Sequence, residues 1–156
     1  MLHGPRVPRL PLHVAHPLLG KPAPAFSVSY LNGKELAVSP GSAPIVLTFF
    51  TSWSETSRRY LPTIEKLYRT YVNRGVRFVA VTDEKKLDTL RDYITSARLT
   101  MPVFRDEKGA VVKAYSMKLV PRTLLIGRNG LIVDVFEGAA PGVAAALDAA
   151  IRTALE

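Results

Sequence analysis

Two serines stand three residues apart directly after the single tryptophan, and they are the first candidates for chemistry in this sequence. Ser54 and Ser57 follow Trp53. A serine hydroxyl attacks a substrate only when a neighbouring base takes its proton. All three histidines lie among the first sixteen residues, and the third position after Ser54 holds a second serine rather than a lysine. We therefore expect Ser54 or Ser57 to cap a helix and not to act as a hydrolytic nucleophile.

Cysteine is absent from all 156 residues, which excludes several kinds of site. Without thiolates the chain forms no disulfide, holds no iron–sulfur cluster and offers no cysteine ligand to zinc. His13 and His16 are spaced to bind a metal only if other ligands come from elsewhere in the fold. The glycine patterns that bind nucleotide phosphates are also missing. We predict no metal ion and no cofactor.

The composition is that of an ordinary globular chain. Apolar residues make up 47% and charged residues 22% of the sequence, which is typical of one folded domain of this length. The net charge is +8, but the basic residues are scattered, with small doublets at Arg58–Arg59 and Lys85–Lys86. A nucleic-acid-binding face usually concentrates them. We predict a solvated basic surface and no nucleic-acid partner.

Residues 1–24 differ from the rest of the chain. They hold half of the 12 prolines and no acidic residue, which predicts a proline-rich leader or tail before one domain of residues 25–156. Prolines and histidines interrupt Leu10–Leu19, so no signal peptide is visible. Apolar runs such as Ile45–Phe50 are far shorter than the roughly 18–20 residues of a membrane span, and we predict no transmembrane segment. Compartment and oligomeric state stay open.

Hydrophobic periodicity predicts the elements of the domain. Phe26–Tyr30 alternates like a half-buried strand, and Asn32–Gly33 is typical of a hairpin turn. Ile45–Phe50 is a continuous apolar run, as in a strand buried on both faces. Pro62 is expected to kink the helix after the serines, and Gly75 to end it. The other predicted elements are strands over 35–38, 76–81, 101–104, 123–126 and 131–136, and helices over 85–98, 110–116 and 139–155.

This order of elements determines a fold class. Parallel neighbouring strands need helical crossovers, and two strands joined by a short turn pair antiparallel. The predicted fold is therefore α/β, a three-layer α/β/α sandwich with a mixed central sheet and an N-terminal β-hairpin.

Four stretches of this sequence resemble a known family. They are Leu18–Phe26, Leu47–Trp53, Val103–Tyr115 and Leu119–Gly130. In this order they are similar to the entry segment, the active-site strand, the segment before the cis-proline and the cis-proline loop of the TlpA/ResA-like thiol–disulfide oxidoreductases, or redoxins. The resemblance implies a thioredoxin-like fold over residues 18–138.

The resemblance also implies which positions would carry chemistry. In the family a Cys-x-x-Cys follows the tryptophan, and those two positions match Ser54 and Ser57 here. The positions where relatives carry acids near the site match Thr48 and Tyr60. A serine hydroxyl forms no disulfide, so we expect this chain to be inactive in thiol–disulfide exchange.

The remaining site residues are implied by the cis-proline loop. Pro121 matches the family's cis-proline, so the Val120–Pro121 peptide bond is expected to be cis. Trp53 is expected to be partly exposed beside the same groove. A protein or peptide partner would then contact Trp53 and Pro121, and the other groove residues would be Glu55, Thr56, Leu119 and Val120.

Several interpretations of the serines stay open. The thiols were lost naturally, leaving a binding or scaffolding module, or both cysteines were deliberately replaced by serine in a disulfide reductase. A peroxiredoxin relative without its cysteine and a basic nucleic-acid-binding domain are further alternatives. The resemblance suggests an extracytoplasmic bacterial site, although no signal segment supports it.

Overall fold

The computed structural model describes residues 17–117 and 119–156, and their central feature is one seven-stranded sheet. The strands lie in the order β2-β1-β5-β4-β3-β6-β7. β4 pairs parallel with β3 and β5, and all other neighbours pair antiparallel. The strands are β1 (Phe26–Tyr30), β2 (Glu35–Val38), β3 (Ile45–Phe49), β4 (Arg77–Thr82), β5 (Val103–Arg105), β6 (Arg122–Ile126) and β7 (Ile132–Glu137).

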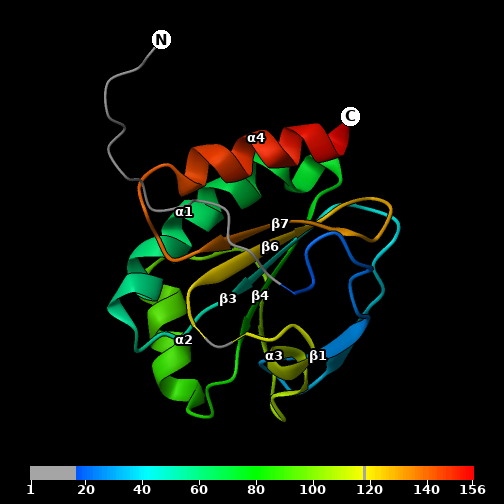
Figure 1. Cartoon of the computed structure of the whole chain (residues 1–156). Coiled ribbons are helices and arrows are strands. Elements are labelled where there is room, and N and C mark those ends of the chain that lie inside the picture. Colours follow the sequence, from blue (N-terminus) through cyan, green and yellow to red (C-terminus); the bar gives the residue numbers. More distant parts are fainter. Residues whose placement is uncertain (1–16, 118) are drawn as a thin grey trace.

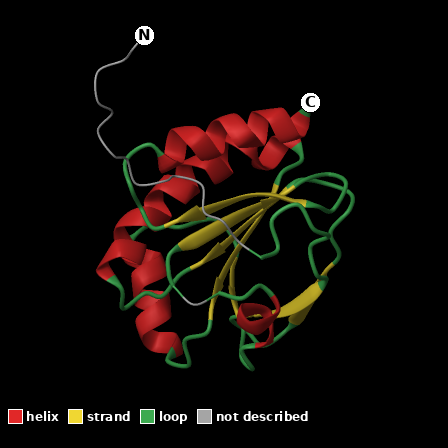
Figure 2. Cartoon of the chain, viewed as in Figure 1, coloured by secondary structure: helices red, strands yellow, loops and turns green. Residues whose placement is uncertain are grey.

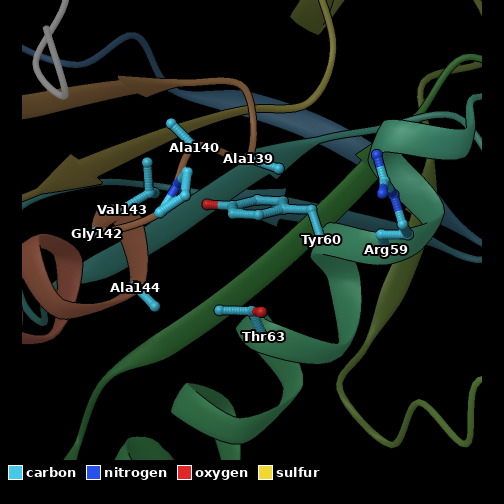
Figure 3. A pocket seen from close by; sticks show the side chains of 9 residues that line it. Arg59, Tyr60, Thr63, Ala139, Ala140, Gly142, Val143 and Ala144 are labelled. Atoms are coloured by element: carbon cyan, nitrogen blue, oxygen red, sulfur yellow. The ribbon is translucent and has the colours of Figure 1, made fainter. Parts of the chain in front are cut away.

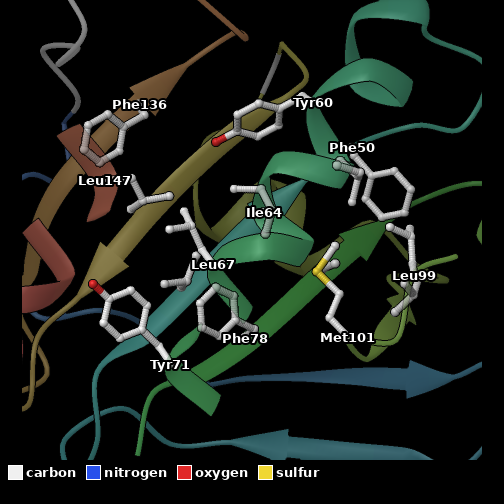
Figure 4. Packing of buried hydrophobic residues seen from close by; sticks show 14 of the residues in the cluster. Phe50, Tyr60, Ile64, Leu67, Tyr71, Phe78, Leu99, Met101, Phe136 and Leu147 are labelled. Carbon is white, nitrogen blue, oxygen red and sulfur yellow. The ribbon is translucent and has the colours of Figure 1, made fainter. Parts of the chain in front are cut away.

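Helices cover both faces of this sheet, so the fold is the thioredoxin-like α/β sandwich that the sequence predicts (Figures 1 and 2). α1, α2 and α4 pack on one face, where the larger apolar cluster lies (Figure 4). The short helix α3 packs on the opposite face over a second cluster. The helices are α1 (Glu55–Tyr71), the 3₁₀ turn η1 (Val72–Arg74), α2 (Leu87–Ser96), α3 (Ala110–Ala114) and α4 (Val143–Leu155).

The central strand β3 contributes to both cores. All five of its residues are buried, as the continuous apolar run predicts. Val46 belongs to the cluster under α1, whereas Ile45, Leu47 and Phe49 belong to the cluster under α3. This alternation follows from the two-residue period of a strand. Because both faces of β3 are largely apolar, the strand lies at the centre of the sheet. The chain leaves β3 at Phe49 and enters α1 at Glu55.

Helix α1 runs through Pro62 without ending there. Proline has no N–H, so it leaves the carbonyl of Arg58, four residues earlier, without its usual helical partner. The hydroxyl of Tyr93 in α2 donates a hydrogen bond to that carbonyl over 2.8 Å. Beyond η1, Gly75 has a φ of 87° and ends the helical segment as predicted, because glycine tolerates this left-handed conformation.

Two helices begin later than the sequence pattern predicts. α2 begins at Leu87 rather than residue 85, because residues 83–86 form a polar connection in which the Glu84 carboxylate contacts other segments. α4 begins at Val143 rather than residue 139, because the preceding Gly142 has a φ of 95°, outside the helical region.

The segment before β1 is attached to the far edge of the sheet. The N–H of Gly20 donates to the carbonyl of Ile132 over 2.8 Å, and the N–H of Ala23 donates to the carbonyl of Gly130 over 2.8 Å. The predicted boundary at residue 24 stays a prediction. His13 and His16 lie outside the described residues.

Candidate functional site

The N-terminus of α1 presents the tryptophan and both serines. Ser54 is the N-cap, and its Oγ accepts a hydrogen bond from the N–H of Ser57 over 3.3 Å, which confirms the predicted capping role. Ser57 is fully buried, and its Oγ accepts from the N–H of Thr51 over 3.4 Å. Trp53 keeps 73% of its surface exposed, more than the partial exposure expected. Glu55 and Thr56 are exposed beside it.

The loop before β6 contains the predicted cis bond. The Val120–Pro121 peptide bond is cis. Pro121 is buried, and its carbonyl accepts from the N–H of Gly138 over 2.9 Å. Leu119, two residues before Pro121, is 61% exposed. The cis bond thus lies at the base of a short loop whose apolar side chain faces solvent.

A small pocket joins these two segments. Its volume is about 180 Å³, and it brings Trp53 together with Val120, 67 positions later in the chain. Leu119 adjoins Val120 at this place, whereas Ser54 and Ser57 do not line the pocket. The complete lining is Phe49, Phe50, Thr51, Trp53, Val81, Asp83, Val112, Met117 and Val120.

A chain of hydroxyl groups lies buried behind the serines. Thr48 and Thr123 face each other across β3 and β6, with 3.1 Å between their Oγ1 atoms, and the Tyr60 hydroxyl lies 2.8 Å from Thr123 Oγ1. Burial raises the pKa of Tyr60 to about 12, while the hydrogen bond to Thr123 opposes the rise. All three groups are therefore neutral near pH 7, so they hold this part of the core together without an ionised side chain.

A second, wider pocket lies on the other side of Tyr60. Its volume is about 330 Å³, and Figure 3 shows the Tyr60 ring between Arg59 and the segment that leads into α4. Small residues of that segment, Ala139–Ala144, form most of its opposite wall. Neither Trp53 nor the cis-proline loop lines it, so it is separate from the pocket between Trp53 and Val120.

Glu84 holds the turn that carries Trp53, a role that the sequence pattern does not reveal. Its carboxylate accepts from the N–H of Ser52 over 2.8 Å and from the hydroxyl of Thr82 over 2.8 Å. The Ser52 hydroxyl donates to the same carboxylate. Ser52 is 3% exposed, so these contacts are largely shielded from water. One acidic side chain after β4 therefore positions the residue before Trp53.

Removing this carboxylate should loosen the turn. In Glu84→Ala the buried N–H and hydroxyl of Ser52 lose their acceptor, which costs about 1–3 kcal/mol of unfolding free energy. We expect the Ser52 amide to exchange with solvent faster while amides in β3 stay protected. Asp83→Ala is the matched control, because Asp83 is an exposed neighbouring carboxylate. Equal exchange in both variants would contradict the positioning role of Glu84.

The described residues offer a limited range of chemistry. Within 17–117 and 119–156, no three His, Cys, Asp or Glu side chains come together that could hold a metal ion. The same residues contain no helix long and apolar enough to cross a membrane. The pocket between Trp53 and Val120 offers mainly apolar contact, with Thr51 and Asp83 as the polar residues of its lining.

Comparison with known proteins places the chain in a family. The sequence model of the Redoxin family matches residues 18–151. The chain belongs to the redoxin family. It is 30% identical over 122 residues to the thiol-disulfide oxidoreductase ResA of Geobacillus thermodenitrificans, covering 77% of this chain and 70% of that protein. ResA of Bacillus thuringiensis is 26% identical over 121 residues, with the same shares covered.

Solved structures agree with this assignment. The crystal structure of a putative thiol:disulfide interchange protein DsbE from Chlorobium tepidum matches this redoxin with a TM-score of 0.80 and 27% identity. The match covers 88% of this chain and 98% of that one. Because this redoxin contains no cysteine, it has no Cys-x-x-Cys redox centre.

Proposed function

We propose that this redoxin is a redox-inactive binding module in which Ser54 and Ser57 occupy the positions of the Cys-x-x-Cys pair. Three features support the assignment of these positions. Ser54 directly follows the exposed Trp53 and caps α1, Ser57 lies one turn further on, and the loop at Pro121 keeps its cis bond. Relatives are named thiol-disulfide oxidoreductases. Exchange of a disulfide needs a thiol, but binding of a protein partner does not, so this chain keeps the binding and loses the exchange.

The observation that carries the proposal is the exposure of two large apolar side chains around one pocket. Trp53 is 73% and Leu119 61% exposed, and the pocket between Trp53 and Val120 adjoins both. Exposed apolar residues gathered at a concave place are typical of a protein interaction surface. Tryptophan is also a frequent source of binding energy in such surfaces.

The partner in this proposal is a protein that presents an extended segment. In this proposal the extended segment lies along the cis-proline loop beside the pocket and binds by adding backbone hydrogen bonds of its own. The side chains of Trp53, Leu119 and Val120 then contact the segment, with Pro121 below them. Glu55 and Thr56 lie exposed at the border of this surface.

Selection and titration of peptides test this function. Phage-displayed twelve-residue peptides are selected on the intact chain and then titrated into ¹⁵N-labelled protein. We expect the Trp53 indole and the amides near Leu119 and Val120 to shift, and Trp53→Ala to weaken binding at least tenfold, as the loss of a central aromatic contact does.

The matched control removes a different exposed apolar side chain. Val133 in β7 is 47% exposed and lies outside the pocket between Trp53 and Val120. Val133→Ala should leave the affinity unchanged. Peptides that shift other surfaces, or that bind Trp53→Ala as tightly as the parent chain, would show that the proposed groove is wrong.

A further inference from the structure

The pocket between Trp53 and Val120 has one ionisable residue in its described lining, which is Asp83. Seven of the nine described lining residues are apolar, and the remaining one is Thr51. Asp83 follows Thr82 at the end of β4 and is exposed to solvent. Because Asp83 both lines the pocket and is exposed, a charged group at the mouth of the pocket can reach its carboxylate.

The fold uses the next acidic residue but not this one. The Glu84 carboxylate accepts from the N–H of Ser52 and from the hydroxyl of Thr82, each over 2.8 Å. Asp83, in contrast, makes no hydrogen bond or ion pair through its carboxylate within residues 17–117 and 119–156. Of these two consecutive acids, Glu84 holds the turn before Trp53, and Asp83 stays available at the pocket.

The other exposed group of the lining is the indole of Trp53, which keeps 73% of its surface in solvent. The face of a tryptophan ring attracts a cation more strongly than other aromatic side chains do. Lysine and arginine also cover apolar surface with their methylene stems while the charged head stays in water. Apolar walls with a carboxylate and an indole at the mouth therefore suit a long basic side chain.

The charge at the pocket differs in sign from the charge of the whole chain, which is +8. Lys85 and Lys86 follow in the sequence and are exposed, but they do not line the pocket, whereas Glu55 is exposed beside Trp53. Salt screens exposed charges over about 8 Å at physiological ionic strength. The carboxylate in the lining therefore decides which charge the pocket favours.

We propose that this pocket binds a lysine or arginine side chain of the partner segment. The methylene stem packs against Val112, Met117 and Val120, and the charged head lies between the Asp83 carboxylate and the Trp53 ring. This inference rests on the proposed binding function and names the class of side chain that the groove selects. Charge complementarity then gives the groove a preference that apolar contact alone does not supply.

Acetylated and amidated pentapeptides Gly-Ala-X-Ala-Gly test the proposal by NMR titration of the intact ¹⁵N-labelled chain at physiological ionic strength. Norleucine has the four-carbon stem of lysine without its charge. With X as lysine we expect binding about three- to tenfold tighter than with norleucine, the factor that an exposed ion pair and a cation–π contact supply together. The arginine peptide should behave like the lysine peptide, and the glutamate peptide should bind most weakly.

Two variants identify the carboxylate that is responsible. Asp83→Asn keeps the shape of the side chain and removes its charge, so it should reduce the preference for lysine over norleucine to about twofold or less. Asp92→Asn is the matched control, because Asp92 is exposed on α2, lies outside the pocket and changes the net charge by the same amount. It should leave the preference unchanged. Equal effects of the two variants would overturn the proposal.

The outcomes separate the inference from the function on which it rests. If the lysine and norleucine peptides bind equally and both shift Trp53 and Val120, or if the glutamate peptide binds tightest, the groove stands and the basic-residue assignment falls. If only the selected twelve-residue peptides bind, their basic residues are replaced by norleucine one at a time, and unchanged affinity throughout overturns the assignment. If no peptide perturbs these residues, both the assignment and the proposed function fall.

Discussion

Replacing Ser54 and Ser57 together with cysteine is expected to create a working disulfide in a chain that otherwise shows no disulfide reductase activity. The two side chains lie one turn apart at the start of α1, where Ser54 Oγ already approaches the Ser57 N–H to 3.3 Å. The N–H groups at a helix N-terminus stabilise a thiolate. The new thiol at position 54 should therefore have the lower pKa and attack first, and the fully buried position 57 should resolve the mixed disulfide.

Insulin reduction with dithiothreitol, compared with the reductant alone, measures this gain. The parent chain should give no turnover above background because it contains no thiol. The double variant should give turnover and should form its disulfide while folded, which mass spectrometry of the alkylated protein detects. Ser54→Cys alone controls for a lone thiol and should be alkylated readily. A disulfide that forms only after denaturation would show that positions 54 and 57 are not the matching pair.

Loss of the Glu65 carboxylate is expected to have the largest effect on stability. Glu65 is 5% exposed in the middle of α1. It accepts from the N–H groups of Thr100 and Met101, each over 2.9 Å, and from Nε of Arg69 over 2.7 Å. The connection between α2 and β5 is therefore attached to α1 through one carboxylate. Glu65→Ala leaves these donors unpaired and should lower the free energy of unfolding by about 3 kcal/mol.

The same residue predicts a pH dependence. Burial alone would raise the pKa of Glu65, but the hydrogen bonds from Thr100, Met101 and Arg69 outweigh it and lower the pKa below its usual 4.5. A lowered folded-state pKa adds stability that is fully present above the unfolded-state pKa and is lost as the pH falls through the folded-state value. The stability difference between the parent chain and Glu65→Gln should therefore shrink below about pH 4.5.

Urea unfolding at pH 7 and at pH 3.5 provides this measurement. Glu35→Gln on β2 is the matched control, because Glu35 is exposed, and it should change the unfolding free energy by no more than about 0.5 kcal/mol. A Glu65→Gln variant that loses the same free energy at both pH values would show that the charge on Glu65 is not what stabilises the connection.

Much of the fold is local enough to be predicted from the sequence. The continuous apolar run of β3 implies burial on both faces, and Gly75 marks the end of the first helical segment because its backbone conformation disfavours other residues. Helix beginnings are predicted less well. The late start of α2 depends on Glu84, whose partner Ser52 belongs to a different part of the chain.

The sequence by itself determined the chemistry that this redoxin lacks and the element that carries its candidate site. The absence of cysteine excludes thiol exchange whatever the fold, and the serine after Trp53 indicates a helix cap from local spacing alone. Only the tertiary structure decided that Trp53 and Val120 border one pocket and that Ser57 is fully buried. The physical reason is that a pocket, and the burial of a side chain, depend on every segment that surrounds them, and the pocket is lined by residues from β3, β4, α3 and the cis-proline loop.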